Sequence, residues 1–256
     1  MGKLQGKVAI ITGASGGLGK QIALRFATEG AKLSICARNE TRLQETVTLC
    51  EEAGAEVLSI PLDLCNYDEL AAFVQATVDR FGTIDILVNN AVTISNPHPF
   101  VEHTLEELDA TVRSGLYGTW SMMQLCFPYL KDKNASVINF GSGAGRAGHE
   151  GFAAYAAVKE AIRGLTRVTA REWGKYGIRV NTVCPSAITD NVKAGLEYLP
   201  PEMKEAVTNL MSINPLCLPG DPYEDITPVV LFMVCDESGW ITGQDINVEG
   251  GGDIHS

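Results

Sequence analysis

Seven short apolar segments that alternate with longer helical segments constrain the fold of this chain more than any other feature. The apolar segments lie at residues 7–11, 31–36, 56–63, 84–90, 135–142, 179–185 and 245–251. Helical patterns cover about 17–29, 39–53, 67–81, 104–130 and 152–176. Strands of this length separated by helices are typical of β-α-β units and a parallel sheet. Several strands are apolar throughout, which predicts a doubly wound α/β fold with helices on both faces.

Length and composition favour a single domain that covers residues 1–256. The 256 residues, 45% of them hydrophobic, suffice for one large core, and no repeat or linker divides the chain. Residues 186–225 are rich in proline and contain no clear strand. Because long irregular loops in compact domains are usually functional, we expect the substrate loop there.

Charge and cysteine content argue against several classes of function. The net charge is −11 without a basic cluster, which argues against a nucleic-acid partner. The seven cysteines are scattered and never form a C-x-x-C pair, so we expect no disulfide framework and no metal site. No apolar run approaches the length of a membrane span, and the N-terminal segment lacks the layout of a signal peptide. We therefore expect a cytoplasmic protein with no membrane partner.

The stretch TGASGGLG (12–19) directly follows the first predicted strand and opens the first predicted helix. Gly13 allows the tight turn, Gly17 lets the backbone approach a pyrophosphate, and Gly19 lets the helix pack closely on the strand. The helix N-terminus adds free N–H groups and a positive dipole end. An ordinary glycine-rich turn is the alternative, but this context favours nucleotide binding and a Rossmann-type sheet.

Tyr155 and Lys159 lie four residues apart on a predicted helix and so share one face. A phenol, with a pKa of about 10, is a poor base at neutral pH, and a nearby ammonium would lower that pKa. Tyr155 would then exchange a proton with a ketone or alcohol oxygen. Ser142, at the end of the fifth predicted strand, could donate a hydrogen bond to the same oxygen. On residue types alone, an ordinary surface pair remains the alternative.

Five stretches of this chain resemble, in the right order, the motifs of the short-chain dehydrogenase/reductase family. They are TGASGGLG (12–19), LVNNA (87–91), YAAVK (155–159), IRVNTVCP (178–185) and ITGQDINVEGG (241–251). The resemblance spans essentially the whole chain and implies an NAD(P)-dependent oxidoreductase that interconverts ketones and secondary alcohols. It also implies that Ser142, Tyr155 and Lys159 are the catalytic residues, and that Lys159 holds the nicotinamide ribose.

The same resemblance extends the predicted cofactor site. Asp63 matches an adenine-contacting aspartate, although it could also cap the helix that follows. Asn89 and Ala91 match residues that line the cofactor and brace the sheet. The complete predicted cofactor-binding set is Gly13, Ser15, Gly17, Leu18, Gly19, Arg38, Asp63, Leu64, Asn89, Ala91, Tyr155, Lys159, Pro185, Ile188 and Thr189.

Arg38 bears on the choice between NADP(H) and NAD(H). Folds that bind NAD usually place an acidic residue at the end of the second strand, where this sequence has Ala37 and then Arg38. An arginine can pair with a 2′-phosphate, although a solvated loop residue is the alternative. We therefore predict NADP(H) as the favoured cofactor and keep NAD(H) as the alternative.

Three positions depart from the family pattern. Val92 and Ser186 each replace a glycine, and both should reshape the substrate side of the cofactor site. Gly115 aligns with a catalytic asparagine whose main-chain carbonyl is thought to hold a relay water next to the lysine. Because glycine keeps the carbonyl and leaves room for a water, our hypothesis is that the proton relay survives.

The predicted substrate pocket is mostly apolar. By resemblance it is built from Val92, Ile94, Gly143, Ala144, His149, Phe152 and Ser186. We therefore predict a small-molecule substrate, a medium-sized and fairly hydrophobic ketone or its secondary alcohol. His149 either orients a polar substrate group or is an exposed loop residue.

Two other readings of the sequence stay open. One is a catalytically silent NADP(H)-binding sensor or scaffold, which Gly115 would suit and an intact Ser142, Tyr155 and Lys159 set argues against. The other is an epimerase or dehydratase on the same fold. The resemblance further implies a homotetramer or homodimer that assembles through helices around 104–130 and 152–173 and the C-terminal strand.

Overall fold

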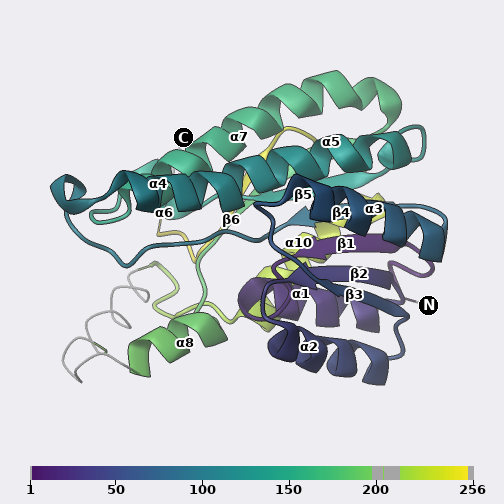
Figure 1. Cartoon of the computed structure of the whole chain (residues 1–256), viewed down its shortest axis with the longest axis horizontal. Coiled ribbons are helices and arrows are strands. Elements are labelled where there is room, and N and C mark those ends of the chain that lie inside the picture. Colours follow the sequence, from purple (N-terminus) through teal and green to yellow (C-terminus); the bar gives the residue numbers. More distant parts are fainter. Residues whose placement is uncertain (1, 198–203, 205–213, 253–256) are drawn as a thin grey trace.

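Seven strands form one parallel sheet at the centre of the computed structural model, which describes residues 2–197, 204 and 214–252 (Figure 1). They are β1 (Val8–Thr12), β2 (Lys32–Ala37), β3 (Val57–Pro61), β4 (Ile86–Asn89), β5 (Ser136–Phe140), β6 (Arg179–Pro185) and β7 (Asp245–Val248). Their order is β3-β2-β1-β4-β5-β6-β7, which confirms the predicted doubly wound parallel sheet. The order reverses between β1 and β4, and in such sheets ligands bind in the crevice at the carboxyl ends of these strands.

Helices cover both faces of the sheet (Figure 1). One face is covered by α1 (Gly17–Thr28), α2 (Glu40–Glu52) and α10 (Thr227–Val234). The other is covered by α3 (Tyr67–Phe81), α5 (Gly118–Leu130) and α7 (Ala153–Trp173), and α4 (Leu105–Thr111) packs on α7. Shorter helices are η1 (Phe100–Glu102), α6 (Gly143–Ala147), η3 (Gly174–Tyr176), α8 (Asp190–Glu197), η4 (Pro222–Ile226) and η5 (Asp236–Ser238).

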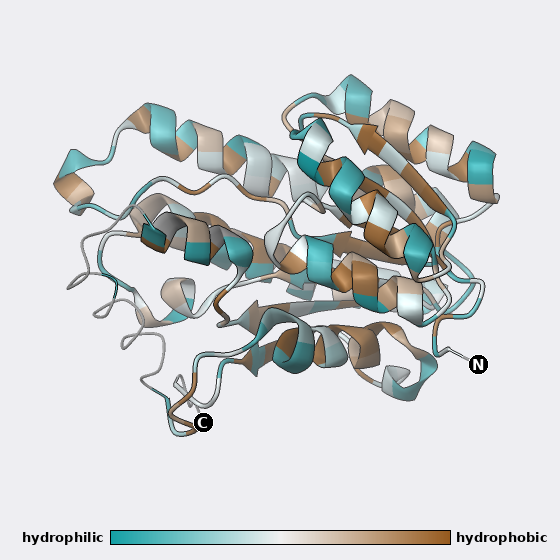
Figure 2. Cartoon of the chain, turned by 90° about the horizontal axis from the view of Figure 1, so that it is seen from below, coloured by the Kyte–Doolittle hydropathy of each residue, from teal (hydrophilic) through white to brown (hydrophobic). Residues whose placement is uncertain are grey.

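The core divides into two layers because successive side chains of each strand point to opposite faces. In β1, Ala9 and Ile11 belong to the layer under α1 and α2, whereas Ile10 belongs to the layer under α3 and α5. All three are fully buried. Figure 2 shows hydrophobic and hydrophilic residues interspersed along the outer helices, as expected for helices with one buried face.

The predicted helix over 104–130 is interrupted. A π-helical segment, η2 (Val112–Tyr117), separates α4 from α5. The N–H of Gly118 donates to the carbonyls of both Arg113 and Gly115, so the regular hydrogen-bond spacing is lost at this point. Glycine disfavours regular helix by about 1 kcal/mol relative to alanine, which makes an irregularity at Gly115 inexpensive.

Among the described residues, three α-helices were not predicted: α6, α8 and α10. In α10, apolar residues fall on all sides of the helix and include the exposed Phe232, so the sequence lacks the 3.6-residue periodicity that identifies a half-buried helix. α8 lies near the start of the predicted substrate loop at 186–225, so part of that loop is helical. The parts of that loop at 198–203 and 205–213 lie outside the described residues.

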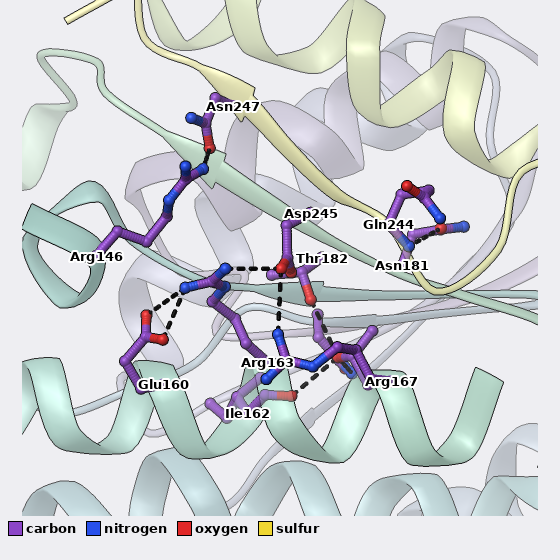
Figure 3. Close-up of polar contacts among 12 residues, drawn as sticks. Arg146, Glu160, Ile162, Arg163, Arg167, Asn181, Thr182, Gln244, Asp245 and Asn247 are labelled. Atoms are coloured by element: carbon purple, nitrogen blue, oxygen red, sulfur yellow. Dashed lines mark hydrogen bonds and ion pairs between the residues drawn. The ribbon is translucent and has the colours of Figure 1, made fainter. Parts of the chain in front are cut away.

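A polar network fastens α7 to the edge strand β7 (Figure 3). Arg163 donates to both carboxylate oxygens of Glu160 at 2.7 Å and to Asp245 at 2.8 Å. Arg167 also reaches Asp245, at 3.5 Å. The side chains of Arg163 and Asp245 are 14% and 16% exposed, so this ion pair is largely shielded from water. The two carboxylates raise the pKa of Arg163, with the hydrogen bond to Asp245 as the largest cause.

All seven cysteines are unpaired. Among the described helices, none combines the length and apolar character required to cross a membrane.

Candidate active site

A cavity of about 520 Å³ opens at the carboxyl ends of β1, β4 and β5. Most of the predicted cofactor residues, two of the three predicted catalytic residues and two predicted pocket residues, Val92 and Ile94, line this cavity. Those that line it are Gly13, Ser15, Gly17, Leu18, Arg38, Asp63, Leu64, Ala91, Val92, Ile94, Tyr155, Lys159, Pro185 and Thr189. Segments far apart in the sequence therefore converge on the crevice that the strand order creates.

The glycine turn between β1 and α1 adopts a backbone that favours glycine. Gly13 has a φ of +70° and Gly17 a φ of +55°. A Cβ on Gly13 would lie 2.9 Å from the Cβ of Ala91, so the turn is pressed against the start of the loop after β4. Gly19 does not line the cavity, but a Cβ there would collide with the carbonyl of Gly13. Gly19 thus permits the close approach of helix and turn.

The N-terminus of α1 already holds a negative group. Gly16, at the N-cap, has no side chain to satisfy the first amides of the helix. The amide of Gly17 instead donates to the Asp190 carboxylate of α8, with an N–O distance of 2.5 Å. A helix N-terminus that seats a carboxylate also suits a phosphate, so the residues present fit a dinucleotide.

The distal end of the cavity contains two arginines. Arg38 is exposed, and no hydrogen bond or ion pair to its side chain occurs among the described residues. Arg42 lies one turn into α2, also lines the cavity, and pairs with Asp190 at 3.3 Å. Sequence reasoning missed Arg42, although its position four residues after Arg38 was the available signal.

Asp63 lies on the cavity wall, and its carboxylate accepts the N–H of Cys65 at 3.0 Å. The N-cap of α3 is Asn66, whose side chain accepts the amides of Asp68 and Glu69. Asp63 is therefore not the N-cap residue of this helix.

Tyr155 and Ser142 meet beside the cavity. Burial raises the pKa of Tyr155, and a side-chain hydrogen bond with Ser142 partly opposes that rise. Ser142 also caps α6, where its Oγ accepts the N–H of Ala144 at 3.1 Å. The ring of Phe152 packs edge-on against Tyr155, with 6.3 Å between centroids. The serine hydroxyl and the phenol are thus positioned next to each other, and Tyr155 is partly buried.

Lys159 is buried below Tyr155 and is 3% exposed. Its Nζ donates to the carbonyl of Phe140 at 2.8 Å and lies 5.4 Å from the centre of the Tyr155 ring. Burial lowers the pKa of Lys159 to about 8. Lys159 makes no resolved contribution to the pKa of Tyr155: burial raises that pKa, and the hydrogen bond with Ser142 is what opposes the rise, in place of the expected ammonium.

Besides Gly19, two predicted cofactor residues do not line the cavity, and each has a neighbour that does. Asn89 is buried and donates to Asn139 at 2.8 Å, which ties β4 to β5. Asn90 lines the cavity and donates to the carbonyl of Thr12 at 2.9 Å. Ile188 donates its N–H to Gly220 at 3.0 Å, whereas Ala187 lines the cavity.

Three predicted pocket residues lie in α6 and the turn that follows it, and they differ in their exposure to solvent. Ala144 is buried, Gly143 is partly exposed, and His149 is exposed. The N–H of Ser186 donates to Val248 at 2.9 Å. None of these four residues lines the cavity formed by the described residues.

Ser114 is a cavity residue that the sequence did not reveal. Its Oγ donates to the carbonyl of Ala110 at 2.7 Å and accepts the N–H of Thr93 at 2.9 Å. It therefore joins η2 to the loop after β4. Further residues missed by sequence reasoning are Gly16, Ala37, Asn39, Thr93, Phe140, Gly141 and Val192.

Comparisons with known proteins agree with this geometry. A family model described as an enoyl-(acyl carrier protein) reductase matches residues 13–253. A 12α-hydroxysteroid dehydrogenase from a Clostridium species is 40% identical over 98% of either chain. The crystal structure of levodione reductase has a TM-score of 0.91 at 31% identity and covers 96% of this chain and 97% of its own. A crystal structure of carveol dehydrogenase from Mycobacterium avium in complex with NAD has a TM-score of 0.88 at 26% identity and covers 98% and 99%.

The family can be assigned from the similarity over almost the whole chain, together with the parallel sheet and the glycine turn. This chain belongs to the short-chain dehydrogenase/reductase family of NAD(P)-dependent oxidoreductases, which act on CH–OH and ketone groups.

Proposed function

We propose that this protein interconverts a medium-sized, fairly hydrophobic ketone and its secondary alcohol with NADP(H) as the favoured cofactor. The observation that supports this most is the hydrogen-bonded Tyr155 and Ser142 pair above Lys159, on the same cavity as the glycine turn. A nucleotide-binding protein without catalytic function would have no need of this arrangement.

In ketone reduction, Tyr155 donates its proton to the carbonyl oxygen while the carbonyl carbon takes up a hydride. The nicotinamide cofactor, when bound, supplies that hydride. Ser142 donates a hydrogen bond to the same oxygen and so stabilises the charge that develops there. The raised pKa of Tyr155 keeps the phenol protonated before the reaction, as a general acid requires. Lys159 then restores the proton to Tyr155, and alcohol oxidation runs these transfers in reverse.

Preference for NADP(H) rests on Arg38 and on the absence of a carboxylate at the end of β2. The exposed guanidinium of Arg38 is available to a 2′-phosphate. Arg42 adds positive charge at the same end of the cavity. NAD(H) stays the alternative, since one of the similar solved structures, that of carveol dehydrogenase, is a complex with NAD.

A hydrophobic substrate fits the apolar side chains next to Tyr155, among them Val92, Ile94 and Phe152. The names of the similar proteins designate a hydroxysteroid, levodione and carveol. A panel of ketones built around these compounds is therefore the first set to assay.

The test follows NADPH absorbance with that panel, for the native protein and for Tyr155→Phe. We expect turnover of at least one ketone by the native protein. The variant should lose activity by at least about 100-fold, with cofactor binding retained. Cofactor binding without turnover of any ketone would favour the sensor, and product formation without net cofactor change would favour an epimerase.

We further propose that the protein assembles as a homodimer or homotetramer through α5 and α7. A second cavity of about 830 Å³ lies between these helices and η2, and its lining is largely apolar. Trp120 and Val168 on this face are 49% and 54% exposed. Trp120→Glu should shift the mass measured by light scattering to a smaller species, and a monomeric native protein would overturn this proposal.

A reducing, cytoplasmic location fits the seven unpaired cysteines.

A further inference from the structure

Two histidines and a glutamate converge away from the catalytic residues. His98 lies in the loop after β4, and His103 and Glu107 flank the start of α4. One nitrogen of each histidine and one oxygen of Glu107 lie within 4.8 Å of one another. The Glu107 carboxylate is 3.2 Å from Nε2 of His98 and 3.8 Å from Nδ1 of His103.

The second ring nitrogen of each histidine fixes its tautomer. Nδ1 of His98 lies 2.6 Å from the carbonyl of Asn96, and Nε2 of His103 lies 3.2 Å from the carbonyl of Gly151. Because a carbonyl only accepts, those two nitrogens hold the protons. The remaining nitrogens, Nε2 of His98 and Nδ1 of His103, are those that lie near the Glu107 carboxylate. Backbone carbonyls serve in the same way to orient histidines that bind metals.

With the protons on the outer nitrogens, Nε2 of His98, Nδ1 of His103 and the Glu107 carboxylate are all acceptors, and a proton on Nε2 of His98 would join only His98 to Glu107. The same Glu107 oxygen also accepts the N–H of Thr104 at 2.9 Å. Nδ1 of His103 is buried without a hydrogen-bond partner, and the side chain is only 7% exposed. A single divalent cation satisfies both lone pairs and the carboxylate together.

We propose that His98, His103 and Glu107 form a binding site for a divalent transition metal ion, with Zn²⁺ the best match. Zn²⁺ accepts imidazole nitrogen and carboxylate oxygen, and three protein ligands leave a fourth position for water. The sequence predicted no metal because that prediction considered the spacing of cysteines. Histidines five residues apart on a loop and a helix cap give no comparable signal.

The position of this site implies what the metal does. The carbonyl of Gly151 accepts from Nε2 of His103 and, at 3.4 Å, from the backbone N–H of His98. Gly151 directly precedes Phe152, which packs on Tyr155. The ion would therefore fasten the loop after β4 to the turn beside the substrate, and act on the Michaelis constant for the ketone more than on the chemical step. This last consequence depends on the proposed function, whereas metal binding does not.

Protein expressed without a histidine tag and treated with a chelator tests the site directly. Calorimetric titration with ZnCl₂ should give one site per chain. Glu107→Gln retains the residue type that a helix capping box accepts, so α4 should fold, but its loss of charge should weaken Zn²⁺ binding at least about tenfold. His98→Ala should do the same. The neighbouring Glu106→Gln and the exposed His149→Ala are matched controls that should bind as the native protein does.

Co²⁺ absorbance distinguishes this site from the exposed thiols of Cys65 and Cys217. The expected spectrum is that of nitrogen and oxygen ligands, without thiolate charge-transfer bands. Absence of stoichiometric Zn²⁺ binding by the native protein would overturn the proposal. So would unchanged affinity in both His98→Ala and Glu107→Gln, or a thiolate spectrum. Each of these results is independent of whether any ketone is turned over.

Discussion

A side chain at Gly115 would collide with Val92. A Cβ built on Gly115 lies 3.0 Å from Cγ2 of Val92 and 2.8 Å from Cγ1 of Val158. The resemblance to the family places asparagine at the first position and glycine at the second. The two departures are therefore one structural feature, in which Val92 fills the space next to a glycine in η2.

Gly115→Asn should destabilise the protein by about 1–3 kcal/mol, because β-branched neighbours cannot easily move aside. Adding Val92→Gly should recover part of that loss, which a double-mutant cycle from urea unfolding would measure as coupling of at least about 0.5 kcal/mol. Gly174→Asn, where a Cβ would meet open space, is the matched control. Additive effects at positions 92 and 115 would contradict the steric relationship.

The same pair of variants tests the proton relay. If the carbonyl of Gly115 already serves the relay, the double variant should have no more activity than the native protein. A rise of about tenfold or more would mean that glycine was a handicap and that the relay hypothesis is wrong. The single Gly115→Asn change cannot answer this question, because its collision with Val92 and Val158 lowers activity for another reason.

Lys159 should make stability depend on pH. Burial lowers its pKa from 10.5 in the ordinary side chain to about 8 in the folded protein. Between these two values the unfolded chain binds the extra proton, so a rise in pH favours the folded state. The native protein should gain up to about 3 kcal/mol relative to Lys159→Met from pH 7 to pH 10.5. Urea unfolding at both pH values measures this, with the exposed Lys175→Met as control.

A difference between the native protein and Lys159→Met that stays constant across this range would show that the buried lysine keeps its ordinary pKa. The sign of the change in stability with pH is a second test. If the native protein lost stability relative to the variant as the pH rose, Lys159 would be stabilised as an ammonium, which the carbonyl of Phe140 alone does not explain.

The sequence predicted those parts of the site that a local pattern determines. Strand and helix periodicity predicted the sheet, and the glycine turn and the Tyr155 and Lys159 spacing predicted residues that line one cavity. Contacts between distant segments gave no signal: Asp190 meets Gly17 across 173 positions. The raised pKa of Tyr155 depends on packing around the ring, which no spacing of residues expresses.

Asp190 should compete with the cofactor for the amide of Gly17. Asp190→Asn removes the charge that occupies the N-terminus of α1, so NADPH and NADH should both bind about 5-fold tighter, which corresponds to about 1 kcal/mol. Fluorescence titration of the reduced cofactors measures both affinities. Glu197→Gln, on the same helix, should leave them unchanged. Weaker binding by Asp190→Asn would show instead that the carboxylate helps to build the site.

Arg38→Ala should separate the two cofactors. Loss of a charged hydrogen bond to a 2′-phosphate is worth about 1.5–3 kcal/mol, so the Michaelis constant for NADPH should rise about tenfold or more. The constant for NADH, which lacks that phosphate, serves as the internal control and should change less than about twofold. Equal effects on both cofactors would remove the basis for the NADP(H) preference.

Asp245→Asn should destabilise the edge of the sheet. The change weakens the shielded ion pair with Arg163 and should cost about 1–3 kcal/mol, moderated because Arg163 keeps Glu160. Arg167→Ala is the matched control, since Arg167 contacts the same carboxylate oxygen but is 53% exposed. Exposed ion pairs contribute at most about 1 kcal/mol to the free energy of unfolding, so Arg167→Ala should destabilise the protein less than Asp245→Asn does. Equal losses in urea unfolding would mean that burial of the Arg163 and Asp245 pair adds nothing to the attachment of α7 to β7.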